Sequence, residues 1–255
     1  MYRNRVYLLC DLLFFLGVIV TNSLAQIIPL GGMNTGEISD MYHTLITPSG
    51  YAFTIWLFIY ALLAGFIVYQ FRRVGTTGTN ASYPHLHVWF MLSCLFNIAW
   101  ILLWQYKYIT LSLVAMILLL ISLAILYVNT QKIVLLTKIE RCFIILPFSL
   151  YFGWICVATL VNIHVVLFQT GIGDKLNFNE TITAIIMLVV GVLAAFLISF
   201  HFLDGVPPLV FVWAYIAIAI EQRWHPKVYL TAGTLSVMLF VYALWIIFMR
   251  ATERD

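Results

Sequence analysis

Aromatic side chains share a helical face with polar or small residues in three separate stretches of the sequence. Residues three, four or seven apart lie on the same side of an α-helix. The three faces consist of Phe53, Trp56 and Tyr60, led by Pro48; of Asn97, Trp100 and Trp104; and of Pro147, Tyr151, Trp154, Ala158 and Asn162. Aromatic rings can stack on a flat molecule, and amides can hydrogen-bond its polar edge. Rings combined with a few polar groups are typical of a small-molecule pocket.

The same residues also have a purely structural explanation. Trp and Tyr gather at membrane interfaces, and polar side chains often only hold membrane helices together. Asn97 and Asn162 would be costly against lipid, so both should face protein or a cavity. Ala158, one turn after Trp154, would leave room beside that large ring. From the residues alone, the pocket and the structural explanation both stay open.

The elements that carry these faces are long apolar segments. Of the 255 residues, 64% are hydrophobic and only 9% are charged, which no soluble domain could bury. The composition predicts an all-α, polytopic membrane bundle with about eight spans. The expected spans are 6–29, 51–71, 87–106, 109–128, 142–168, 182–203, 208–221 and 230–250. The seventh is short and begins at Pro207-Pro208.

The distribution of Lys and Arg predicts the orientation in the membrane, because cytoplasmic loops carry the excess. In an eight-span arrangement with both termini inside, nine of these residues are cytoplasmic and four are not. The cytoplasmic nine are Arg3, Arg5, Arg72, Arg73, Lys132, Lys138, Arg141, Arg250 and Arg254, against Lys107, Lys175, Arg223 and Lys227. We therefore expect a multi-pass protein of the cell membrane with both termini cytoplasmic. The net charge of +3 includes no basic cluster, so no nucleic-acid partner is expected.

Other polar groups could do chemistry, but they do not combine into a catalytic site. Asp11 lies within the first apolar run, where it could be functional or could simply reach water or Arg5. His201 and Asp204 share a face and could form a proton relay or a metal pair. His164 is a weak candidate for a haem ligand because no second histidine lies at a matching depth. GIGD at 171–174 matches the GxGD pattern of intramembrane aspartyl proteases, but it falls in a loop between spans and is better explained as a glycine turn. The four cysteines show no metal-binding spacing, and no HExxH, GxSxG, Walker or Rossmann pattern is present, so we expect no enzyme and no metal.

All three aromatic faces resemble those of a known family. A proline-led helix start followed by Trp and, four residues later, Tyr describes Pro48, Trp56 and Tyr60. The stretch FNIAW contributes Asn97 and Trp100. Both patterns are similar to the second and third helices of the TspO family, the tryptophan-rich sensory proteins also called peripheral benzodiazepine receptor or translocator proteins.

The strongest part of the resemblance is LPFSLYFGWICVATLVN, which is similar to the last helix of that family. It matches at Trp154, Ala158 and Asn162, with spacings of four and eight. The resemblance covers about residues 6–168, so we expect a TspO-like five-helix domain in 1–168 and an additional three-helix region in 169–255. The usual double proline is reduced to Pro48, and the family's WSPLFF run is replaced by WILLWQY.

The resemblance implies a binding or sensor protein for a flat hydrophobic ligand, such as a porphyrin, a haem-like tetrapyrrole or a sterol. The three aromatic faces would form its cavity, with no cofactor required beyond a porphyrin or haem bound as ligand. Membrane lipid and a second copy of the chain are the other candidate partners. The alternative is a proton- or ion-coupled transporter that uses Asp11, His201 and Asp204 and the proline-broken seventh segment.

Overall fold

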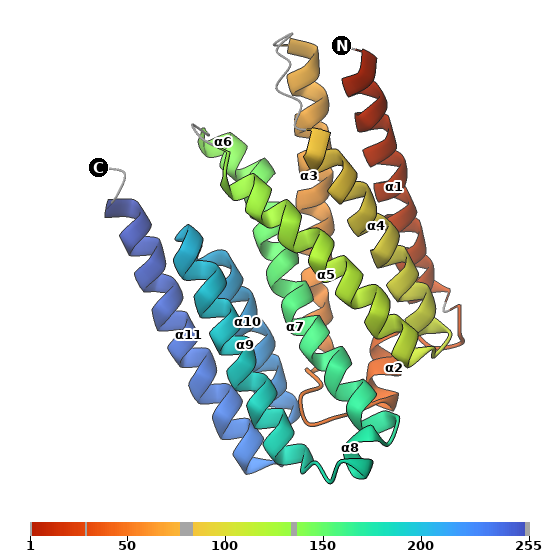
Figure 1. Cartoon of the computed structure of the whole chain (residues 1–255), viewed down its shortest axis with the longest axis vertical. Coiled ribbons are helices and arrows are strands. Elements are labelled where there is room, and N and C mark those ends of the chain that lie inside the picture. The colour runs from red at the N-terminus through yellow and green to blue at the C-terminus, as the bar shows by residue number, and fades with distance from the viewer. Residues whose placement is uncertain (1, 29, 77–83, 134–136, 253–255) are drawn as a thin grey trace. The chain divides into compact units, whose positions relative to one another are not determined.

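The computed structural model describes residues 2–28, 30–76, 84–133 and 137–252, and all regular secondary structure there is helical (Figure 1). The longer ones are α1 (Tyr2–Ile27), α3 (Ile55–Thr76), α4 (Pro84–Gln105), α5 (Ile109–Gln131), α7 (Leu146–Gln169), α9 (Glu180–Phe202), α10 (Val206–Glu221) and α11 (Pro226–Thr252). Short helical pieces connect them: α2 (Thr35–Met41), the 3-10 helix η1 (Gly50–Thr54), α6 (Lys138–Glu140), the π-helix η2 (Arg141–Ile145) and α8 (Ile172–Lys175).

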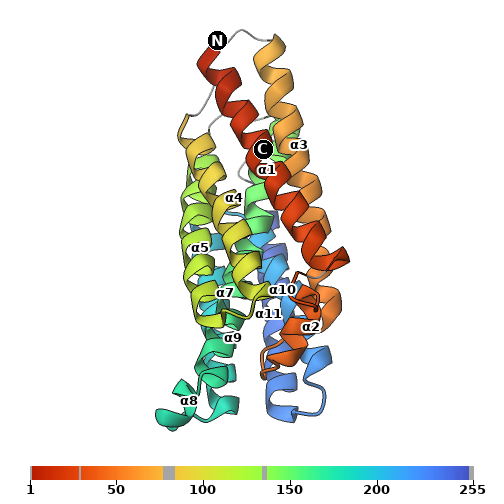
Figure 2. The same ribbon diagram turned by 90° about the vertical axis from the view of Figure 1, so that its right-hand side faces the viewer.

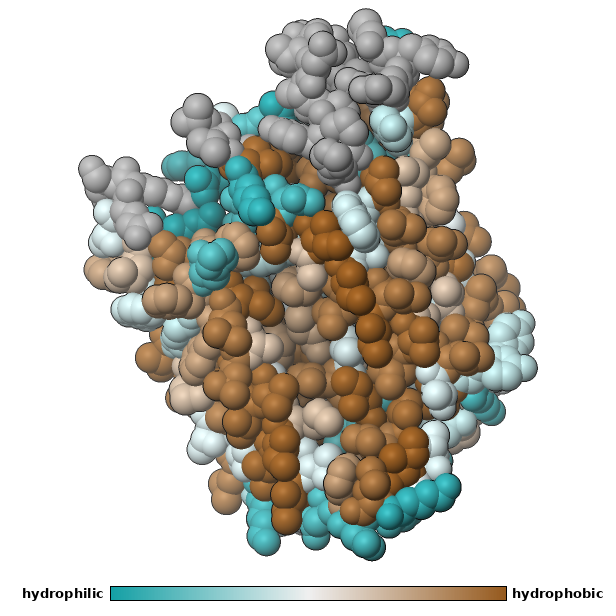
Figure 3. All heavy atoms as spheres, in the orientation of Figure 1, coloured by the Kyte–Doolittle hydropathy of each residue, from teal (hydrophilic) through white to brown (hydrophobic). Residues whose placement is uncertain are grey.

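Seven helices of the described chain are long and apolar enough to cross a membrane. The expected seventh span, α10, is a shorter apolar helix of 16 residues. Hydrophobic side chains cover most of the face drawn in Figure 3, and hydrophilic ones gather near helix ends. Lipid is the solvent that tolerates such an apolar surface. A bilayer also requires the backbone groups of each span to be paired, and helices meet that requirement. The chain is therefore a multi-pass, all-helical membrane protein, as its composition predicts.

Two compact units make up the fold, and each is described by itself. The first contains Met1–Thr35 and Ile55–Phe152, and the second contains Gly36–Thr54 and Gly153–Asp255. Helix α7 begins in the first unit and ends in the second. The bounds of these two packing units differ from those of the expected family domains, 1–168 and 169–255. The family domains stay a prediction.

In the first unit, α4 packs against α1 and α5, and aromatic rings join α4 to its other neighbours. Phe66 of α3 lies 5.6 Å from Phe90 of α4 and 5.0 Å from Phe148 of α7, measured between ring centroids. All three rings are buried, so their area contributes hydrophobic and dispersion energy to the contact of these helices. This packing holds α3, α4 and the start of α7 together.

In the second unit, polar bonds fix the segment before α3 on α9 and α10. Gln222 donates its side-chain amide to the backbone oxygens of Thr44 and Thr47, at 3.2 and 3.4 Å. The Trp213 indole donates to Ala52 O at 3.1 Å, and Glu180 accepts a bond from Leu45 N at 3.1 Å. The segment before α3 is thus fixed to the start of α9, to α10 and to the residue that follows α10. The views in Figures 1 and 2 trace this segment from α2 onward.

Candidate functional site

Trp56 lies at the centre of an aromatic cluster in the first unit. Its ring stacks on Tyr60, with centroids 5.3 Å apart and planes at 23°, and on Trp100, at 6.3 Å and 28°. Tyr151 meets it edge to face at 5.7 Å and 71°. Trp100 stacks in turn on Trp104 at 6.1 Å and 24°. The predicted faces of α3 and α4 therefore meet, together with Tyr151 of α7, in one series of rings, called the aromatic cluster below.

A chain of hydrogen bonds runs along this cluster through Asn97. The amide of Asn97 is fully buried and donates to the Tyr151 hydroxyl at 2.9 Å. Its oxygen accepts a bond from the Asn22 amide, also at 2.9 Å, and Asn22 donates a further bond to Val18 O. Asn97 thus faces protein, as the cost of burying an amide requires. The two amides thus pair across α1 and α4, and both the oxygen and the nitrogen of the buried Asn97 amide have a partner.

Sequence reasoning missed Asn22, although a signal was present. It is an amide within an apolar run of membrane-spanning length, the same signal that identified Asn97. No aromatic residue follows Asn22 at three or four positions, so it formed no stripe of its own. An amide within a membrane span is expected to bond another polar group of a neighbouring helix, even where no aromatic face accompanies it.

The cluster is closed at one end and accessible at the other. Trp100 and Trp104 are 5% exposed, whereas Trp56 and Tyr60 are partly exposed. The Trp104 indole makes a long bond of 3.4 Å to Thr35 O, which fixes that end to the segment after α1. Trp100 Nε1 is buried and has no hydrogen-bonding partner in the part of the chain described here. The Tyr60 hydroxyl is likewise buried without a partner among the described residues. A ligand that approaches from Trp56 and Tyr60 would therefore find two buried donors.

The remaining predicted residues belong to the second unit. Phe53 and Trp154 meet edge to face, with ring centroids 6.2 Å apart and planes at 84°. Trp154, Pro48 and Asn162 are buried, and Ala158 is partly exposed. The predicted set thus divides into the aromatic cluster of the first unit and the Phe53–Trp154 pair of the second. Whether the two groups share one ligand cavity stays a prediction.

The structure gives Asp11 a partner that the sequence did not reveal. Its Oδ2 lies 2.5 Å from Nδ1 of His87, and both side chains are almost completely buried between α1 and α4. The Tyr7 ring lies parallel to His87, at 5.5 Å between centroids and 5° between planes. The expectation that the Asp11 carboxylate reaches water or Arg5 is therefore wrong, because it is buried and bonded to His87. The other carboxylate oxygen, Oδ1, is buried with no partner among the described residues.

The other candidate chemistry does not assemble into a site. Asp204 is buried and caps the start of α10 by accepting a bond from Val206 N at 3.1 Å, while His201 is exposed. His164 is buried with its ring 4.7 Å from that of Phe168. Within the described ranges, no three His, Cys, Asp or Glu side chains lie close enough together to hold a metal ion.

Comparison with protein families agrees with the aromatic patterns. The family model described as TSPO-like protein matches residues 8–245. The match extends past residue 168 and so includes α9, α10 and most of α11. Comparisons with curated proteins and with solved structures find no match. Because the family model covers nearly the whole chain, this membrane protein belongs to the TSPO-like family.

Proposed function

We propose that the protein binds a flat, hydrophobic ligand of the porphyrin or sterol type and acts as a membrane receptor or sensor for it. The observation that carries the proposal is the aromatic cluster around Trp56, with the buried amide of Asn97 beside it. Membership of the TSPO-like family supports a binding protein of the membrane.

The chemistry of the cluster suits binding better than catalysis. Its members are indole rings, amides and the phenols of Tyr60 and Tyr151, which are suited to stacking and hydrogen bonding. No acid, base and nucleophile converge on it in the described chain, and the Asp11–His87 pair involves different residues of α1 and α4. A flat macrocycle would stack on Trp56, and the Trp100 indole would be free to donate to its polar edge.

Tryptophan fluorescence tests this proposal directly. Purified protein titrated with a porphyrin should show saturable quenching, since the rings that we place at the site are themselves the fluorophores. The same protein in liposomes should move no porphyrin across the bilayer. Quenching that never saturates would contradict a defined site. Flux that follows a proton gradient would instead favour transport.

Coupled transport is the second candidate, and the Asp11–His87 pair favours it. Ionisable groups buried in membrane spans often mark proton pathways, and this pair links two helices. If transport is the function, Asp11→Asn should abolish gradient-driven flux in liposomes while ligand quenching persists. Unchanged flux in Asp11→Asn protein would remove the pair from the mechanism.

A further inference from the structure

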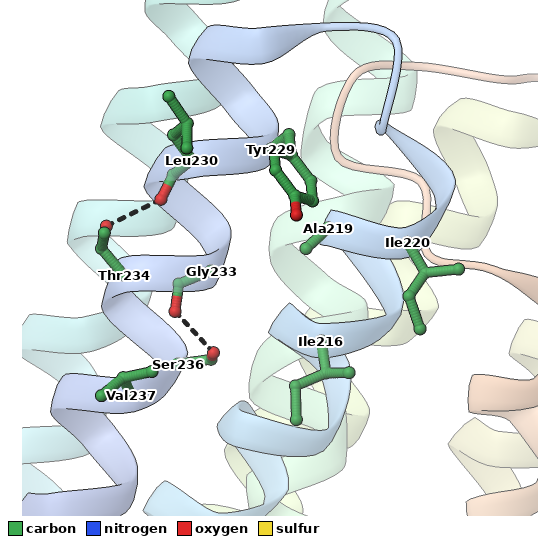
Figure 4. Close-up of a pocket in the computed structure, with 9 residues that line it drawn as sticks. All are labelled: Ile216, Ala219, Ile220, Tyr229, Leu230, Gly233, Thr234, Ser236 and Val237. Carbon is green, nitrogen blue, oxygen red and sulfur yellow. Dashed lines mark hydrogen bonds between the residues drawn. The ribbon is translucent and has the colours of Figure 1, made fainter.

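A second candidate site lies on the second unit, between α10 and α11. A groove of about 560 Å³ runs between these helices (Figure 4). Ile216 and Ile220 form the wall on α10, and Leu230 and Val237 form the wall on α11. Gly233 lies on α11 between Leu230 and Val237, and a Cβ added to Gly233 would meet no atom within 4 Å. The missing side chain of Gly233 therefore gives the groove part of its depth.

Two of the polar side chains that line the groove, Ser236 and Thr234, are already bonded to the backbone of α11. Ser236 donates to Gly233 O at 2.7 Å, and Thr234 donates to Leu230 O at 2.8 Å, as drawn in Figure 4. A hydroxyl that bonds its own helix offers little to a polar ligand. Apart from the Tyr229 hydroxyl near one end, the surface left for an occupant is hydrocarbon, so the groove suits an aliphatic chain.

The groove opens toward the lipid. Helix α11 is apolar enough to span the membrane, and the exposed fractions of Leu230 and Val237 are 60% and 64%. Surface that is exposed on a membrane-spanning helix is covered by acyl chains of the bilayer. The occupant with direct access is therefore a membrane lipid.

One end of the groove carries positive charge. Tyr229 and Ile220 lie at the end where the chain passes from α10 to α11 (Figure 4). That connection contains Arg223 and Lys227 against Glu221, all exposed, and α11 begins at Pro226. The positive end of the helix dipole and the two cations together favour an anion there.

An aromatic side chain marks this end as a membrane interface. Trp224 is 80% exposed, and the Arg223 guanidinium lies 5.3 Å from its ring centroid. Exposed Trp beside Arg and Lys is the usual composition at the depth of lipid head groups. The apolar groove and the basic connection thus follow one another along the helices in the order of the tail and head of a phospholipid.

We propose that this groove binds one acyl chain of an anionic glycerophospholipid, with its phosphate at Arg223, Lys227 and the start of α11. The site is separate from the aromatic cluster. It does not depend on the function proposed above.

Native mass spectrometry of the detergent-purified full chain tests the proposal, with phosphatidylglycerol and phosphatidylcholine added separately. The wild type should retain phosphatidylglycerol at least fivefold more than phosphatidylcholine. Gly233→Leu fills the groove and should lower retention of both lipids at least tenfold. Arg223→Gln combined with Lys227→Gln should lower phosphatidylglycerol to the level of phosphatidylcholine and leave the latter unchanged.

Leu244→Phe is the matched control, because it adds bulk two turns beyond Val237 at a 51% exposed position outside the groove. It should bind like the wild type. If Gly233→Leu protein does not fold, Val237→Phe blocks the groove from an exposed wall position and should show the same loss. Full retention in the folded groove variant would overturn the proposal. Equal retention of the two lipids by the wild type would overturn it as well.

Discussion

At the scale of single residues, the aromatic cluster joins two kinds of interaction at one place. Trp56 contacts three rings, and Asn97 bonds the hydroxyl of one of them, Tyr151. Edge-to-face and stacked pairs each add about 0.5–1.5 kcal/mol beyond the buried area. A group that loses its buried partner costs about 1–3 kcal/mol. Replacing a ring therefore tests binding, and replacing a hydroxyl tests stability.

Trp56→Ala should weaken porphyrin binding by more than tenfold. The substitution removes the partly exposed ring on which a ligand would stack, and about 1.4 kcal/mol corresponds to one decade in Kd. Quenching titrations measure the change. Trp224→Ala is the control, since Trp224 is 80% exposed and its ring lies against Arg223, outside the cluster. It should stay within about twofold of the wild type. Equal losses in both variants would show general damage and remove the cluster from the binding site.

Tyr151→Phe should destabilise the fold by about 1–3 kcal/mol, because it leaves one hydrogen of the buried Asn97 amide without its acceptor. The ring contact with Trp56 is retained, so the loss isolates the hydroxyl. Thermal unfolding in detergent measures it. Tyr106→Phe, at a 55% exposed position, should leave the midpoint unchanged. A midpoint equal to the wild type in Tyr151→Phe would mean that the buried amide finds another partner.

At the scale of elements, the close approach of helices depends on small residues at particular positions. Gly191 of α9 faces α7 and α10, and a Cβ there would come within 3.0 Å of carbons of Leu160 and Phe211 and would press on the Tyr215 hydroxyl. That hydroxyl already donates to Leu188 O of α9 at 2.6 Å. Helices of membrane proteins gain from such approaches because lipid supplies no hydrophobic force between them.

Gly191→Ala and Gly233→Ala should change stability in opposite directions. Alanine is the better helix former by about 0.8–1.0 kcal/mol, so an unobstructed position should gain. Gly233 is unobstructed, and its variant should melt higher. At Gly191 the overpacking costs about 1–3 kcal/mol, which exceeds the gain, and its variant should melt lower. The comparison is made in detergent by thermal unfolding; a rise at both positions would show that α9 can move away from α7 and α10.

At the scale of the whole molecule, the number of true spans depends on α10. Its 16 residues make a helix of about 24 Å at 1.5 Å per residue, shorter than the roughly 30 Å of hydrocarbon. Eight spans place both termini on one side, and seven place them on opposite sides. The excess of Lys and Arg in alternate loops favours the first arrangement, although Arg254 lies outside the described residues.

Reporter fusions should therefore place both termini in the cytoplasm. A reporter after Asp255 and one before Met1 should give the cytoplasmic signal, because nine of the thirteen cations then face inward. A reporter between Gly31 and Gly50 should give the opposite signal. If the two termini report different sides, α10 does not cross, and the span count falls to seven.

The sequence by itself determined the class of the protein and the composition of its helix faces. A chain with 64% hydrophobic residues in span-length runs can only be a helical membrane protein, since the backbone must pair within each span. Helical periodicity likewise determined that Trp56 and Tyr60 share a face, because that relation depends on spacing alone. The motifs on these faces were also enough to indicate the family that the chain-wide match then showed.

Only the tertiary structure decided which faces meet. Asn97 hydrogen-bonds to Asn22 and Tyr151, and Asp11 hydrogen-bonds to His87 instead of Arg5. The periodicity of one helix shows which side is polar, but not which of several similar apolar helices packs against it. Partners far apart in the chain are chosen by the packing of all neighbouring side chains together. For the same reason, the groove beside Gly233 appears only when α10 and α11 are placed side by side.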